Sequence, residues 1–327
     1  MLRIIQYGLS VLGLLLTSVI AWGDNCAAND KVRYLGVGTL DIHYKGFRIL
    51  TDPYFTPFSM WDIATFKPYE TDMQALVYAL GKPNPSINAV LIGHGHYDHA
   101  GDAPALVEYL DEDATFFASK TSNNLISAEL QKAMPSLSFV SMQDNEQKDK
   151  WHYIADGWVR VKAMESEHAP QIWNINLFSG DVINKKEAPP KKVWQWKQGI
   201  NYTWMMDFLS GQNSDDVYKR IFIQTSASNY PIGIIKSSEK VDYTFLAAAS
   251  FDNVDDYPSG LLRQYQPSNA VFIHWENFFK PWLSDNGEQV DPIALSLIDF
   301  DELEAIAREA SPRSEYVVAK PGNCFLL

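Results

Sequence analysis

Long uncharged apolar segments are scarce in this sequence, and the clearest one lies at the N-terminus. Residues 7–20 form an apolar run without charge, preceded by Arg3 and followed by Ala21, Trp22 and Gly23. The run is shorter than the ~20 residues that a membrane-spanning helix needs. Small residues at 21 and 23 suit the −3 and −1 positions of a cleavage site. We therefore predict that residues 1–23 are a cleaved signal peptide, that no stable membrane span remains, and that the protein is secreted or periplasmic. An uncleaved anchor is the alternative, and it too places the rest of the chain outside the cytoplasm.

Basic residues are also in short supply. The chain has 27 Lys and Arg against 40 Asp and Glu, for a formal net charge of −13. An acidic protein gains nothing from counterion release on nucleic acid, so neither DNA nor RNA is expected as a partner.

Cysteine is limited to two residues, Cys26 and Cys324, which lie near the two ends of the mature chain. Neither has the neighbours of a metal-binding or nucleophilic cysteine. In an oxidising compartment an even count permits one disulfide, but the sequence leaves open whether these two residues pair.

The composition predicts a packed core. Hydrophobic residues make up 46% of the chain and aromatic residues 13%, which excludes overall disorder. No linker of low complexity divides residues 24–327, so a single domain is expected. Short runs of β-branched and aromatic residues predict strands at 32–35, 39–44, 47–50, 89–92, 115–118, 138–141, 158–164, 201–209, 219–225, 243–248 and 271–273. Periodic apolar residues and caps predict helices that begin at Asp102 and that cover 123–134 and 301–310.

Histidine is rare as well, yet three of the seven histidines fall within six residues. His94, His96 and His99, together with Asp98, directly follow the strand predicted at 89–92. Alternate residues of an extended chain point to the same side, so His94 and His96 can hold one ion. As the chain turns into a helix, Asp98 and His99 can reach a second position. Imidazole and carboxylate are the ligands that zinc prefers, so the pattern predicts a metal site.

The spacing His-x-His-x-Asp-His resembles the signature of the metallo-β-lactamase superfamily. The runs Leu35–Leu40 and Gly46–Pro53 resemble the branch that contains lactonases and N-acylphosphatidylethanolamine phospholipase D-like hydrolases. The resemblance implies an α/β fold, a four-layer αββα sandwich with the metals at one edge between the sheets. In that branch a histidine often stands where this chain has Val37.

The resemblance also implies two further metal ligands and one orienting residue. His168 follows the strand at 158–164 and matches the third histidine of the first metal. His274 follows the strand at 271–273 and would complete the second metal with Asp98 and His99. Asp52, before a proline, would orient a ligand histidine from the second coordination shell, although a turn residue at a strand end is an alternative. His43 and His152 are interpreted as ordinary structural or surface residues.

One expected ligand has no clear counterpart. The family places a bridging aspartate after a later strand, but here that strand runs into Thr225 and Ser226. Asp181, in a Ser-Gly-Asp sequence, lies only 13 residues after His168, which makes it a weak alternative. A hydroxyl is a poor metal ligand, so either the second ion binds weakly or one ion suffices.

The resemblance implies a metal-dependent hydrolase that uses metal-activated water on an ester, lactone or phosphodiester bond, and the predicted signal peptide implies that it is exported. Asp98 is the candidate for orienting that water or moving its proton. One or two Zn²⁺ ions are expected, with Fe or Mn as alternatives, and the substrate is a small or lipid-like molecule. Two rival hypotheses are an iron-dependent oxidoreductase on the same fold and a degenerate metal-binding protein without turnover. Trp194, Trp196, Tyr202 and Trp204 either line a substrate pocket or pack the second sheet, and Tyr54, Phe55, Phe58 and Trp61 are candidates for the same pocket mouth.

Overall fold

The computed structural model describes residues 24–170, 176–229, 231–232, 240–281, 283, 290–295 and 298–327. The predicted signal peptide lies outside these residues. None of the helices formed by the described residues has the length and apolarity that crossing a bilayer requires.

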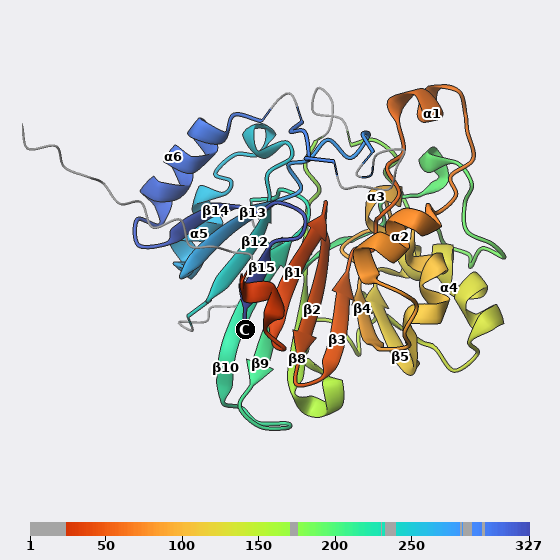
Figure 1. Ribbon diagram of the computed structural model, residues 1–327, viewed down its shortest axis with the longest axis horizontal. Helices are drawn as coiled ribbons and strands as arrows, with labels where there is room; N and C mark the ends of the chain where they lie inside the picture. The colour runs from red at the N-terminus through yellow and green to blue at the C-terminus, as the bar shows by residue number, and fades with distance from the viewer. Residues whose placement is uncertain are drawn as a thin grey trace, which may run out of the picture.

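Two mixed β-sheets pack face to face and form the centre of the molecule (Figure 1). The first sheet has the strand order β15-β1-β2-β3-β4-β5-β6, and the second has the order β11-β8-β9-β10-β12-β13-β14, with β7 paired to β8. The strands of the first sheet are β1 (Lys31–Gly36), β2 (Thr39–Tyr44), β3 (Phe47–Thr51), β4 (Ile87–Leu91), β5 (Leu110–Ala118), β6 (Ser138–Ser141) and β15 (Cys324–Leu326). Those of the second are β7 (His152–Ile154), β8 (Val159–Ser166), β9 (Asn201–Leu209), β10 (Val217–Gln224), β11 (Pro231–Ile232), β12 (Tyr243–Ala247), β13 (Asn269–Ile273) and β14 (Glu315–Val318).

Successive side chains of each strand point to opposite faces of its sheet, so one set of side chains lies between the two sheets. Leu40, Ile42 and Tyr44 of β2 join Trp204 and Phe245 from the second sheet in this buried layer. Side chains on the opposite faces of the sheets pack against helices, which form the two outer layers.

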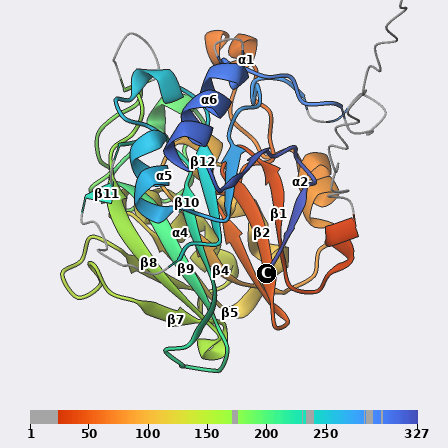
Figure 2. The same cartoon turned by 90° about the vertical axis from the view of Figure 1, so that its left-hand side faces the viewer.

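The outer helices lie on opposite sides of the sandwich, as Figures 1 and 2 show. α2 (Met73–Leu80) and α4 (Lys120–Ala133) cover the first sheet, whereas α5 (Ser259–Tyr265) and α6 (Phe300–Ala310) cover the second. Asp72, Ser119 and Asp299 cap the N-termini of α2, α4 and α6 through side-chain hydrogen bonds. The α/β four-layer sandwich predicted from the sequence is therefore confirmed.

The helix predicted to begin at Asp102 is present as a short 3₁₀ helix and not as an α-helix. Residues Ala103–Tyr109 form a 3₁₀ helix, η2, and Leu110 already belongs to β5. Asp102 makes no capping hydrogen bond, because its buried carboxylate accepts hydrogen bonds from the backbone N–H groups of Phe55 and Thr56 and from the hydroxyl groups of Tyr69 and Thr71. These bonds tie the loop after β3 to the segment that follows the histidines.

The two cysteines form a disulfide, Cys26–Cys324, with their Cα atoms 5.2 Å apart. The pairing follows from β15, which lies antiparallel to β1 and brings the C-terminus beside Lys31. The sequence left this bridge open, since β15 itself was not predicted.

Candidate metal centre

The candidate ligands gather where strands from both sheets end. β4 leads into the loop Ile92–His96 and then into the short helix α3 (Tyr97–Ala100), which lies at the upper edge of the sandwich in Figure 1. His168 follows β8, and His274 follows β13. The loop needs glycine at position 95, because a Cβ there would stand 2.3 Å from the Lys197 carbonyl oxygen.

His94, His96 and His168 form the first group of ligands. His94 Nε2 lies 3.0 Å from His96 Nδ1 and 3.1 Å from His168 Nε2. An imidazole nitrogen either donates or accepts one in-plane hydrogen bond, so at most one of these two contacts can be a hydrogen bond. Three nitrogens bound tetrahedrally to zinc at 2.0–2.1 Å would lie about 3.3 Å apart. The side chains therefore fit one divalent ion.

The protonation states favour metal binding by this group. Burial lowers the pKa of His94 and of His96 well below the ordinary value, and neighbouring imidazoles lower both further. Burial lowers the pKa of His168 to about 4. All three rings are consequently neutral at pH 7, which is the state that binds a metal. His168 Nδ1 lies 2.7 Å from the Ala169 carbonyl oxygen, which leaves Nε2 for the ion.

Asp98, His99 and His274 form the second group. Asp98 Oδ2 lies 3.6 Å from His99 Nε2 and 3.8 Å from His274 Nε2. The His94 and His99 rings are 4.0 Å apart between centroids, so the two groups are adjacent. Burial raises the pKa of Asp98. Burial alone would lower the pKa of His99, but the carboxylates of Asp98 and Asp52 raise it.

Asp52 stands directly behind the second group. Its Oδ2 lies 2.8 Å from His99 Nδ1, and its Oδ1 accepts a 2.6 Å hydrogen bond from the Gly93 N–H. Both Asp52 and His99 are buried. The carboxylate therefore fixes the ring of one ligand and the loop that carries the others, which is the orienting arrangement that the sequence predicts.

Thr225 lies beside Gly93 of the histidine loop and stands at the chain position where the resemblance calls for a carboxylate. A Cβ at Gly93 would lie 2.7 Å from Thr225 Oγ1, and one at Gly38 would lie 2.7 Å from Asp52 Oδ2. Thr225 is buried, and its hydroxyl has no hydrogen-bond partner among the described residues.

Asp181 is exposed, accepts a hydrogen bond from Thr121 and belongs to neither group, so the alternative of Asp181 as a bridging ligand is wrong.

The structure adds two residues that the sequence did not indicate. Tyr34 of β1 donates a 2.7 Å hydrogen bond to Glu276 Oε2 and accepts a 2.9 Å bond from the His274 N–H. His274 has a φ of 53°, and these contacts hold its backbone in that left-handed conformation. Burial raises the pKa of Glu276 to about 7. In the sequence, Tyr34 cannot be distinguished from any other strand residue. The position of Glu276, two residues after His274, was the one sequence feature that could have indicated a role near the metal centre.

The other predicted residues lie outside the centre. His43 pairs with Asp41 at 3.1 Å, and His152 begins β7, as expected of structural residues. Trp196 and Trp204 are buried, Trp196 in the layer under α2 and α4 and Trp204 between the sheets, so both pack the fold. Among the aromatic residues expected at a pocket mouth, Tyr54, Phe55 and Phe58 are buried, whereas Trp61 on α1 (Met60–Ala64) is exposed.

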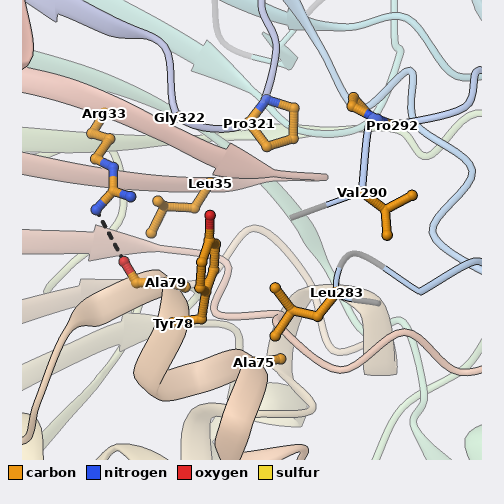
Figure 3. A pocket seen from close by; sticks show the side chains of 10 residues that line it. All are labelled: Arg33, Leu35, Ala75, Tyr78, Ala79, Leu283, Val290, Pro292, Pro321 and Gly322. Carbon is orange, nitrogen blue, oxygen red and sulfur yellow. Dashed lines mark hydrogen bonds between the residues drawn. The ribbon is translucent and has the colours of Figure 1, made fainter. Parts of the chain in front are cut away.

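Two cavities differ in their relation to the centre. One of ≈ 610 Å³ has His168 in its wall. The other, of ≈ 60 Å³, lies between β1 and α2 and is mostly apolar; Arg33 at its rim donates a hydrogen bond to the Ala79 carbonyl (Figure 3). No candidate ligand lines this smaller cavity, so we assign it no role in the chemistry.

Comparisons with known proteins find a similar fold and a family model that covers part of the chain. Residues 47–188, which include Asp52, the histidine loop and His168, match the family model described as "Beta-lactamase superfamily domain". A possible metal-dependent hydrolase from Veillonella parvula has a similar structure, with a TM-score of 0.53 and 10% identity over 92% of this chain and 100% of that one. The metallo hydrolase Igni18 from Ignicoccus hospitalis gives a TM-score of 0.51 and 13% identity over 91% of this chain and 97% of that one. No curated protein sequence is a significant match.

The fold is thus the metallo-β-lactamase fold, which the structural neighbours share, and the sequence of residues 47–188 is similar to the family model. A third neighbour, the diiron β-hydroxylase CmlA from Streptomyces venezuelae, gives a TM-score of 0.51 and 13% identity over 92% of this chain and 55% of that one. Neighbours with this fold accordingly include both hydrolases and an oxygenating enzyme.

Proposed function

We propose that the protein is an exported, metal-dependent hydrolase of the branch that contains lactonases and N-acylphosphatidylethanolamine phospholipase D-like hydrolases. The observation that carries the proposal is the contact of His94 Nε2 with two other imidazole nitrogens at 3.0 and 3.1 Å. Zn²⁺ is the ion that a neutral three-histidine group suits best. The Cys26–Cys324 disulfide supports export, because such bonds persist in oxidising compartments.

A divalent ion held by these residues would lower the pKa of water and polarise the scissile oxygen of an ester, lactone or phosphodiester. The chain itself supplies a carboxylate for proton movement. Asp98 Oδ2 faces both His99 and His274, and burial raises its pKa, so without a metal this oxygen accepts a proton more readily than an exposed aspartate does. Asp52 and Tyr34 keep the His99 ring and the His274 backbone in place.

An iron-dependent oxidoreductase is the second candidate. The observation in its favour is Thr225, which leaves the second group with one carboxylate and two imidazoles. Two histidines with one carboxylate are also the ligand set of many non-haem iron enzymes. The identity of the ion that restores activity separates the two proposals.

The experiment begins with protein stripped by a chelator and then loaded separately with Zn²⁺, Mn²⁺ or Fe²⁺ under anaerobic conditions. Initial rates are measured on a chromogenic ester, a lactone and a phosphodiester for the unaltered protein, for His96→Ala and for the matched control His152→Ala. We expect zinc to restore hydrolysis, His96→Ala to lose it and His152→Ala to retain it. Hydrolysis that survives metal removal, or that survives His96→Ala, would contradict the proposal. Full loading without any turnover would favour the degenerate alternative.

A further inference from the structure

The cavity of ≈ 610 Å³ adjoins the first group of ligands. His168 lines its wall, together with the end of β8, the start of β9 and the loop that follows β10. A substrate in this cavity therefore sits beside a residue of the metal centre. The volume falls within the ~300–1,000 Å³ of small-molecule sites.

The lining of this cavity is acidic and rich in carboxamides. Glu165, Glu167 and Asp255 supply three carboxylates, and the described lining residues include no lysine or arginine. Five carboxamide side chains complete the polar lining: Asn176, Gln198, Asn201, Asn229 and Asn253. Lys148 Nζ lies 3.9 Å from Glu165, so at least one of the three charges is partly balanced. The cavity still offers an excess of negative charge and of hydrogen-bond acceptors.

The wall beside His168 is held by a buried hydrogen-bond network. Asn201, 1% exposed, donates from Nδ2 to Ser166 Oγ at 2.7 Å and to the Glu167 carbonyl oxygen at 2.8 Å. The Glu167 N–H donates to Ser228 Oγ at 3.2 Å. Asn201 Oδ1 has no partner among the described residues, which leaves a buried acceptor in a residue of the cavity wall. The backbone on both sides of Glu167 is thus fixed next to a metal ligand.

We propose that this cavity binds a positively charged, ammonium-bearing part of the substrate, while the scissile bond of the same molecule reaches the metal centre. This inference rests on the proposed hydrolase function and adds the class of substrate. An ammonium group is attracted by the carboxylates and is surrounded by acceptor oxygens, whereas an anionic group such as a phosphodiester would meet three like charges. Among the described residues, His168 alone is shared between the cavity and the ligand groups, so most of the cavity wall lies away from the positive charge of a bound metal.

The test uses two thioesters that differ only in charge. Acetylthiocholine carries a trimethylammonium group, and S-(3,3-dimethylbutyl) thioacetate replaces its nitrogen by carbon. The ratio of their kcat/KM values is measured for the zinc-loaded protein, for Glu167→Gln and for the control Glu309→Gln, which alters an exposed carboxylate on α6. We expect the cationic thioester to be favoured, and Glu167→Gln to reduce the ratio about 5-fold, as expected for one charge ~4 Å away in water. The control should leave the ratio unchanged. A ratio of one or less in the unaltered protein, or a ratio that Glu167→Gln does not change, would overturn the inference.

A binding measurement separates this inference from the hydrolase proposal. Choline and 3,3-dimethylbutan-1-ol are titrated into the zinc-loaded protein and its variants, with saturation-transfer NMR as the readout. Tighter binding of choline that depends on Glu167, without turnover of either thioester, would support the cationic cavity and count against the hydrolase. Hydrolysis of the neutral thioester with equal binding of both alcohols would support the hydrolase and refute the cationic cavity.

Discussion

The substitution Asp52→Asn is expected to affect the metal affinities of the two ligand groups differently. The carboxylate contacts His99 Nδ1 at 2.8 Å and accepts from the Gly93 N–H at 2.6 Å, and both partners are buried. Asparagine keeps the size and one acceptor oxygen, so the Gly93 contact can persist. The variant loses the negative charge that orients the His99 ring and raises its basicity.

Loss of such an orienting carboxylate lowers metal affinity by about 10–100-fold, equivalent to about 1.4–2.7 kcal/mol. The weakening should fall on the group of Asp98, His99 and His274, because Asp52 contacts the His99 ring directly, whereas its contact with the Gly93 N–H of the histidine loop can persist in the variant. Competition with a chromogenic zinc chelator, which resolves tight from weak sites, measures both affinities.

Asp41→Asn is the matched control for this experiment. Asp41 is also buried, and it pairs with Arg48 at 2.7 Å, away from the ligands. Breaking that pair should cost about 3–5 kcal/mol of folding stability and leave zinc affinity unchanged. Equal weakening of both metal sites by Asp52→Asn, or no weakening of either, would show that Asp52 does not orient a ligand of the second group.

Three further predictions concern the same molecule. Thr225→Asp should tighten the weaker metal site tenfold or more in the same chelator assay, because a carboxylate ~4 Å from a cation contributes about 4 kcal/mol at an effective dielectric of ~20, less its own desolvation; an unchanged affinity would show that Thr225 does not face the ions. In metal-free protein, burial holds the pKa of His168 at about 4, below the unfolded value of 6.5, so the unfolded state takes up the proton first as the pH falls. The free energy of unfolding should therefore fall between pH 6.5 and 4, and this residue should account for about 2 kcal/mol of the loss at pH 5. Urea unfolding at pH 7 and pH 5 measures this loss, with His168→Ala for comparison. An equal loss in the unaltered protein and in His168→Ala would contradict the prediction. Reduction of Cys26–Cys324, which closes a loop across 298 residues, should lower the free energy of unfolding by about 3–5 kcal/mol, and equal urea midpoints with and without reductant would contradict this.

The local part of the site was predictable from the sequence. His94, His96, Asp98 and His99 lie within six residues, so the geometry of one loop after one strand brings them together. His168 and His274 each follow a buried strand, and strands of both sheets end at the same edge, so the resemblance sufficed to place them.

The rest depends on contacts between distant parts of the chain. Tyr34 and Glu276 are 242 residues apart, and nothing local in β1 marks a tyrosine whose hydroxyl supports a ligand backbone. Asp102 was predicted to cap a helix because its sequence neighbours suit a helix N-terminus. Its carboxylate instead accepts hydrogen bonds from the Phe55 N–H and the Thr71 hydroxyl, which come from a distant part of the chain.

The most direct test of the central claim is the metal content of the purified protein, measured by elemental analysis beside His96→Ala and His152→Ala. We expect one to two equivalents of a divalent metal, zinc above all, in the unaltered protein and in His152→Ala. We expect His96→Ala to lose at least one equivalent, because His96 supplies one of the three nitrogens of the first group. A metal content that His96→Ala leaves unchanged, or protein that binds no divalent ion at all, would contradict the central claim.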